Sequence, residues 1–328
     1  MSQVNVVEPK PSGGRRLAHI VIAVVIFAVI PALLMAALAG EVGVSALFTG
    51  VLLGGTGAKL GGTRRMLYVV PVVGLAAGLG AISAYDWGWV ALLAAAGFVA
   101  GAGIRFGWLP PLLMVPFAAT FVSPASSADD ALTWGVIVGL GAGYGILLAR
   151  RFGAPEVVEG DRLGPPAAAT VAIVFAAILG GSAAIGVALS WTEPYWVPEP
   201  ILILVLYILM GKRDRIRGKA IGTAVGVCAA LPVAILAPPA AVLTAIGTVT
   251  FVIALLEAKR YWLMYGLYTF SLILLLAAPS QVGFEAEERG VQILVGVGLL
   301  VVGLFIVHAL GGWLQRRDPQ PELAPGEA

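Results

Sequence analysis

Apolar runs of helix length recur along the whole chain and leave room for little except membrane spans and short loops. Crossing the hydrocarbon core of a bilayer takes about 20 apolar residues of helix, and a spanning helix satisfies its own backbone hydrogen bonds. Only 12% of the 328 residues are charged and 59% are hydrophobic, whereas soluble domains carry roughly a quarter charged residues. The sequence therefore predicts an all-α polytopic membrane protein.

Breaking the runs at charges, prolines and glycines predicts twelve spans in two groups of six. The first six are expected at about 17–40, 43–58, 66–84, 87–104, 107–123 and 130–149, and the second six at about 167–190, 196–211, 218–236, 240–256, 261–278 and 289–312. The chain then divides into an N-terminal tail (1–16), a first six-helix repeat (17–151), a linker (152–166), a second six-helix repeat (167–314) and a C-terminal tail (315–328).

Basic residues support this span count, because lysine and arginine concentrate in cytoplasmic loops. With twelve spans and both termini inside, the basic residues fall on the cytoplasmic side and only Arg289 falls outside. Adding or removing one span would flip every later loop and destroy this segregation. We therefore expect a multi-pass protein of the cell (inner, cytoplasmic) membrane with both termini in the cytoplasm.

The two halves repeat the same order of features. Glu41 precedes Arg65 at the interval that separates Glu193 from Arg217, and each half closes on an arginine pair. Because each half has an even number of spans, the halves lie in the same orientation and are parallel repeats, which places the expected site between them. The oligomeric state stays open, since this duplication could supply in one chain the interface that a six-span relative would obtain as a homo-oligomer.

Residues that could carry catalysis are sparse. His19, His308 and the single Cys228 stand apart, with no nucleophile and base in sequence reach of one another and no metal-ligand spacing. We expect a protein that is not an enzyme, with no cofactor, no metal and no nucleic-acid partner.

Glu199 is the acid that the sequence singles out, between Pro198 and Pro200 near the outer end of its span. An acid inside an apolar segment is a candidate for proton or ion coupling. The alternative is structural, because proline suits the first turn of a helix and a carboxylate there is favoured by the helix dipole.

A basic cluster lies around the start of the ninth predicted span: Lys212, Arg213, Arg215, Arg217 and Lys219. Such a cluster binds anionic lipid headgroups or concentrates anionic substrates at a cytoplasmic mouth. Arg65 and Arg217 begin matching spans of the two halves, so they are our candidates for binding a substrate carboxylate.

The second half resembles the fusaric acid resistance protein-like family, which is related to aromatic acid exporters and more distantly to plant aluminium-activated malate channels. The residues that carry the resemblance are Tyr195, Trp196, Val197, Pro198, Arg217, Gly222, Thr223, Gly226, Tyr261, Trp262, Tyr265, Thr269 and Arg289. The first half is covered only through the repeat. The chain departs from the larger exporters, which carry a large cytoplasmic domain between or after the membrane halves.

This resemblance implies efflux of aromatic or other organic carboxylates, driven by the proton gradient. Our hypothesis places Arg65 and Arg217 on the carboxylate of a small organic anion, and Glu199 takes up an external proton. Aromatic side chains contact the apolar body of the substrate: Tyr207, Tyr265 and Tyr268. The alternatives are a passive anion channel similar to the malate channels and a non-transporting membrane scaffold.

Overall fold

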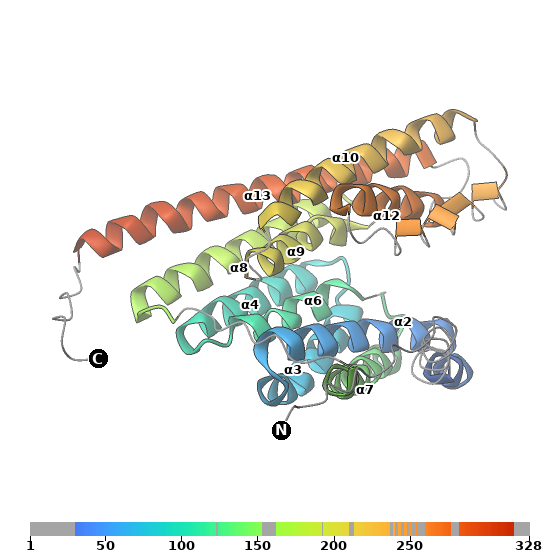
Figure 1. Cartoon of the computed structure of the whole chain (residues 1–328). Coiled ribbons are helices and arrows are strands. Elements are labelled where there is room, and N and C mark those ends of the chain that lie inside the picture. The colour runs from blue at the N-terminus through green and yellow to red at the C-terminus, as the bar shows by residue number, and fades with distance from the viewer. Residues whose placement is uncertain are drawn as a thin grey trace, which may run out of the picture.

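A computed structural model describes most of the chain: residues 30–122, 124–152, 162–191, 193–209, 213–236, 239, 242–243, 246–247, 249–250, 253–254, 260–276 and 282–317. The regular elements within these residues are all helical (Figure 1). In chain order they are α2 (Ile30–Gly61), α3 (Thr63–Ile82), α4 (Trp87–Ala102), η2 (Gly103–Phe106), α5 (Leu109–Leu112), α6 (Met114–Thr120), α7 (Ala128–Phe152), α8 (Pro165–Ala188), η3 (Pro194–Trp196), α9 (Pro198–Leu209), α10 (Arg213–Leu236), α12 (Tyr261–Leu276) and α13 (Val282–Arg317).

Helix boundaries follow the predicted spans closely where the structure describes them. Within α2 the backbone leaves the helical region at Ala39 (φ −140°, ψ 17°) and Gly40 (φ 63°, ψ −155°), which separates the first predicted span from the second. The N-terminal tail, most of the first span, most of the linker and much of the tenth span (240–256) lie outside the described residues.

The last helix differs from the prediction at its beginning. We expected it to start at residue 289, after an acidic outer loop, but α13 begins at Val282 and includes those acids. Carboxylates in the first turns of a helix are favoured by its dipole, so acidic residues there did not mark a loop.

Six helices in the described part of the chain are long and apolar enough to cross a membrane: Gly43–Gly61, Thr63–Ile82, Trp87–Phe106, Ala128–Arg151, Pro165–Ala188 and Glu288–Leu310. Shorter apolar helices occupy Leu109–Thr120, Pro194–Leu209 and Ile221–Val233. The chain is therefore an all-helical, multi-pass membrane protein. Twelve complete spans are not established, since α9, at 12 residues, is only about 18 Å long.

The fifth predicted span is interrupted and lies in the middle of the first half. Pro110 and Pro111 occupy α5, Pro116 lies in α6, and Gly107 has a left-handed backbone (φ 70°) just before them. Proline removes a backbone donor and breaks a continuous helix. Every residue of α6 is buried, and its helical neighbours are α2, α3, α4 and α9.

Glycines let the long helices approach closely, as packing in lipid requires. A Cβ atom on Gly135 of α7 would lie 2.8 Å from the carbonyl oxygen of Gly74 in α3. In the second half, a Cβ atom on Gly226 of α10 would lie 2.5 Å from the carbonyl oxygen of Gly266 in α12. These backbones leave no room for a side chain between them.

The two halves meet where α8 lies alongside α4 (Figure 1). This seam is apolar and tightly packed: a Cβ atom on Gly101 would be 2.7 Å from the Cα atom of Ala172, and one on Gly180 would be 2.8 Å from the Cβ atom of Ala94. We expected a polar passage between the halves, and along α4 and α8 the structure has close packing instead.

Candidate functional site

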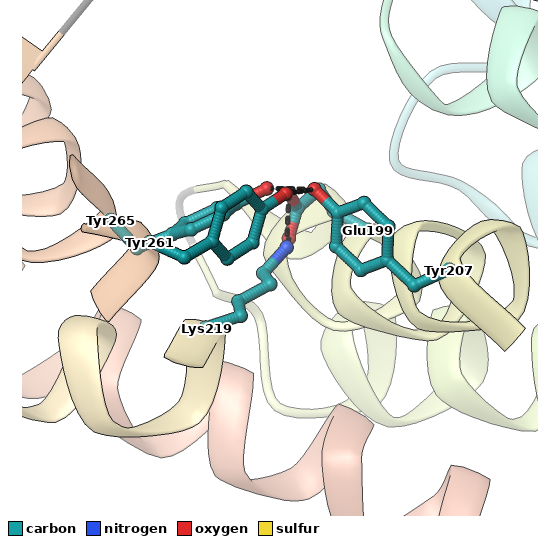
Figure 2. Close-up of polar contacts among 5 residues, drawn as sticks. All are labelled: Glu199, Tyr207, Lys219, Tyr261 and Tyr265. Carbon is teal, nitrogen blue, oxygen red and sulfur yellow. Dashed lines mark hydrogen bonds and ion pairs between the residues drawn. The ribbon is translucent and has the colours of Figure 1, made fainter. Parts of the chain in front are cut away.

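Two short segments of the second half bring an acid and a base together inside the protein. Glu199 lies in the first turn of α9 and Lys219 in the second turn of α10. The Lys219 Nζ atom donates to both carboxylate oxygens of Glu199, at 2.9 and 3.2 Å (Figure 2). Both residues are buried, with 6% and 5% of their surface exposed for Glu199 and Lys219.

The ion pair is buried although Glu199 lies in the first turn of α9. Lys219 follows the first residue of α10 by six residues, about 9 Å, and Glu199 precedes the last residue of α9 by about 15 Å. The sequence hypothesis treated Lys219 as one of the bases of a surface cluster. In the structure its side chain instead extends into the bundle, because a buried carboxylate offers the partner that a buried ammonium requires.

Three tyrosine hydroxyls meet beside this pair. Tyr261 of α12 donates to the hydroxyl of Tyr207 on α9, and the hydroxyls of Tyr207 and Tyr265 also hydrogen-bond (Figure 2). The Nζ atom of Lys219 lies 5.4 Å from the centroid of the Tyr265 ring, a cation–π distance. The tyrosines and the ion pair therefore form one polar cluster, which we call the Lys219 cluster: Glu199, Tyr207, Lys219, Tyr261 and Tyr265.

The chemistry of the Lys219 cluster suits an anion with a ring. A buried ammonium and phenol hydroxyls are hydrogen-bond donors, and a carboxylate on a buried cation makes a strong, charge-assisted contact. Glu199 already occupies that place. Tyr268 extends the aromatic wall, with its ring centroid 6.4 Å from that of Tyr265 in an edge-to-face arrangement.

Four of the predicted site residues thus gather in one place: Glu199, Tyr207, Tyr265 and Tyr268. Arg65 does not join them; its Nη1 atom donates to the carbonyl oxygen of Gly107 at 2.9 Å within the first half. The side chain of Arg217 lies outside the described residues.

Sequence reasoning missed Lys219 as a buried partner and missed Tyr261. A signal for Tyr261 was present, since it precedes Tyr265 by four residues and Tyr268 by seven, the spacing of one helix face.

A second polar cluster, which we call the Arg289 cluster, consists of Glu193, Trp196 and Arg289. The Arg289 Nη2 atom donates to Glu193 Oε2 at 2.9 Å, and the Trp196 Nε1 atom donates to the same oxygen at 2.8 Å. The guanidinium carbon of Arg289 lies 4.9 Å from the centroid of a Trp196 ring. Arg289, the base that the topology left outside, is only 2% exposed.

Aromatic rings of both halves surround the Arg289 cluster. Tyr195 packs on Trp196 (5.2 Å between centroids) and stacks on Tyr85 (6.2 Å). Tyr85 lies between α3 and α4 in the left-handed region (φ 68°), a strained conformation for a bulky residue. Burial, with a smaller contribution from the Glu193 carboxylate, raises the pKa of Tyr85, so its hydroxyl stays a neutral donor.

A cavity of about 600 Å³ lies elsewhere, along α3 and α7. Its lining is almost entirely apolar, including Leu75, Leu79, Leu132 and Leu140, which are exposed on the surface of the bundle. A groove of this kind in a membrane protein faces lipid chains, so it is not a candidate site for a charged ligand.

Both clusters lie in the part of the chain that matches a known protein family. No curated protein and no solved structure matches the chain. One family model matches, over less than half of the chain, and its region runs from α8 into α13 and holds every residue of both clusters. That family suggests a role in membrane transport or efflux. Residues 178–303 match the fusaric acid resistance protein-like family, which confirms the resemblance carried by the second half.

Proposed function

We propose that the chain is a secondary exporter of organic, preferentially aromatic, carboxylates across the cytoplasmic membrane, coupled to protons at Glu199. One observation carries the proposal: a buried Glu199–Lys219 ion pair under a group of tyrosine hydroxyls, inside the region that matches an efflux-associated family. Ionised side chains in the interior of membrane proteins are costly and mark transport pathways by default.

Exchange of carboxylates is the central step of the proposal. The substrate carboxylate takes the place of the Glu199 carboxylate on Lys219, and its ring lies against Tyr265 and Tyr268. Glu199 therefore occupies the carboxylate position on Lys219 while no substrate is bound. Lys219 takes over the carboxylate-binding role that we expected of Arg65, which is held by a backbone carbonyl in the first half.

The same exchange sets the direction of proton coupling. Once the substrate occupies Lys219, Glu199 loses the ion pair that it makes there, and a buried ionised carboxylate without a cation is costly. Glu199 then binds a proton. In this scheme anion and proton bind together and leave on the same side, so export follows the gradient of the acid itself. This proposal replaces the uptake of an external proton that the sequence hypothesis gave Glu199.

The proposed architecture keeps twelve spans in two parallel six-helix repeats, with both termini in the cytoplasm. Recurring helix pairs support it: α3 packs on α6 and α7 in the first half, and α10 packs on α12 and α13 at the corresponding positions of the second half. In this orientation Arg217 and its basic neighbours lie at the cytoplasmic mouth, where they attract anionic substrates and bind anionic lipids.

Efflux from proteoliposomes tests the proposal. Vesicles carry internal hippurate, an aromatic carboxylate whose polar amide slows passive diffusion, and the leak of protein-free vesicles is subtracted. We expect saturable efflux with one proton per anion and no response to an imposed membrane potential. Efflux that follows the potential and carries current would indicate the channel instead, and no protein-dependent flux would indicate the scaffold.

Variants of Lys219 and Glu199 test which residue binds the anion and which binds the proton. Lys219→Gln is expected to abolish efflux, because the substrate loses its cation. Glu199→Gln is expected to retain hippurate movement but without the proton, so its flux responds to membrane potential. Arg105→Gln is the matched control, since Arg105 is an exposed base of the first half whose guanidinium contacts the Phe106 ring. Unchanged proton coupling in Glu199→Gln would exclude Glu199 from the mechanism.

A further inference from the structure

We propose that the Arg289 cluster is a second anion-binding subsite, which takes the carboxylate of an aromatic acid after it leaves Lys219. This inference rests on the proposed function and deepens it. It starts from the arrangement of charge: Arg289 is buried, whereas the Glu193 side chain that it contacts is 28% exposed. The cation can therefore be reached from the side that Glu193 occupies.

The groups around Arg289 match an aromatic carboxylate. One oxygen of Glu193 accepts from both the Arg289 guanidinium and the Trp196 indole, so two donors already converge on the position of a carboxylate oxygen. The Trp196 indole bonds to that oxygen, and the Tyr195 ring packs on Trp196, so a bound ring would contact aromatic side chains. Glu193 would then be displaced, as Glu199 is at Lys219.

A further buried polar side chain lies about one helical turn after Arg289 on α13. Gln292 is 0% exposed, and its amide nitrogen donates to Glu288 at 2.7 Å. Its side-chain oxygen has no hydrogen-bond partner among the described residues. Such an oxygen is costly to bury unless it accepts a hydrogen bond. A water, or the amide N–H of an acid such as hippurate, would satisfy it.

The position of Arg289 along the helices fits a route from Lys219. Gly290 lies against the Val227 side chain of α10, where an added Cβ atom would be 3.4 Å away. Val227 follows Lys219 by eight residues, about 12 Å along α10. In the proposed orientation this direction is outward. Two cations whose levels along α10 differ by about 12 Å, each held by an internal carboxylate, would give the anion two successive binding places on one path.

Binding of benzoate to the purified chain in detergent tests the subsite, measured by isothermal titration. The Glu199→Gln/Lys219→Met double variant removes both charges of the Lys219 cluster and leaves the Arg289 cluster intact. In that background we expect one remaining benzoate site. Adding Glu193→Gln should tighten it on the order of tenfold, because the internal competitor loses its charge, and adding Arg289→Gln should abolish it.

Two further measurements keep the test decisive if Arg289→Gln does not fold. Cyclohexanecarboxylate has the same charge without the ring, and the Glu193→Gln variant should prefer benzoate over it, a preference that Trp196→Leu should reduce. Benzamide, which is neutral, should not bind. Wild-type binding of benzoate that disappears completely in the double variant, or an affinity that Glu193→Gln leaves unchanged, would overturn the subsite and leave the proposed function standing. No benzoate binding by the wild-type chain would instead overturn the proposed function.

Discussion

Removing one charge of the Glu199–Lys219 pair should cost far more stability than removing both. Lys219→Met leaves a carboxylate in a site where Glu199 is 6% exposed, and breaking a buried pair in this way costs about 3–5 kcal/mol. At roughly 2 °C per kcal/mol for a chain of this length, the melting temperature should fall by roughly 6–10 °C. Glu199→Gln should lose less, because the Lys219 ammonium keeps its contact with the Tyr265 ring.

The double variant Glu199→Gln/Lys219→Met should recover most of this loss, since replacing both members of a buried pair by neutral groups is often close to neutral. Melting curves of the detergent-purified chain, read by light scattering or by loss of the monodisperse peak, measure all three. Arg105→Met serves as control and should shift the curve by little, because Arg105 is exposed. A double variant that loses the sum of the two single losses would refute the reasoning, as would single variants no less stable than the control.

Three further predictions concern the tyrosines, the glycines and the topology. Tyr207→Phe should reduce hippurate efflux and lower the free energy of unfolding by about 1 kcal/mol, because Tyr207 bonds to both Tyr261 and Tyr265. Tyr68→Phe should cost less, since Tyr68 is 63% exposed. Efflux kinetics and melting curves measure both effects. Gly135→Val should lower the yield of folded chain, since the added Cβ atom would clash with the backbone of α3. Gly143→Val should not, because an added Cβ atom there meets nothing within 4 Å. Size-exclusion profiles of the two variants test this. In a Cys228→Ala background, Ser190→Cys should react with an impermeant maleimide on intact cells and Arg162→Cys only after lysis; the opposite pattern would invert the proposed orientation.

Helix positions could be predicted well from sequence, because a run of apolar residues indicates a membrane helix and a glycine or proline indicates where a helix is interrupted. The break at Gly40 and the proline-interrupted helices α5 and α6 both fall where the sequence indicates. The start of α13 could not be read in the same way. Acidic residues suit both an outer loop and the first turns of a helix, and composition alone does not separate the two.

The candidate site could be predicted only in part, because its members come from three helices whose relative depth depends on tertiary packing. Glu199 was visible as an acid in an apolar run, and Tyr265 and Tyr268 as aromatic residues of one span. Lys219 was hidden among surface bases, since nothing local distinguishes a lysine that extends toward the headgroups from one that extends into the bundle.

The buried charges of the described residues all lie in one half of the chain. Among the described residues, the buried charged side chains are Glu199, Lys219, Glu288 and Arg289, all in the second half. In the proposed repeat, the first-half position that corresponds to Glu199 is Leu47, so the proposed correspondence of the halves does not extend to the ion pair. Because the α4–α8 seam is closed by small residues, the two halves do not share a polar path there. Under the proposed function, this arrangement favours one transport path per chain, inside the second half along α9, α10, α12 and α13, with the first half packed against that half along α4 and α8.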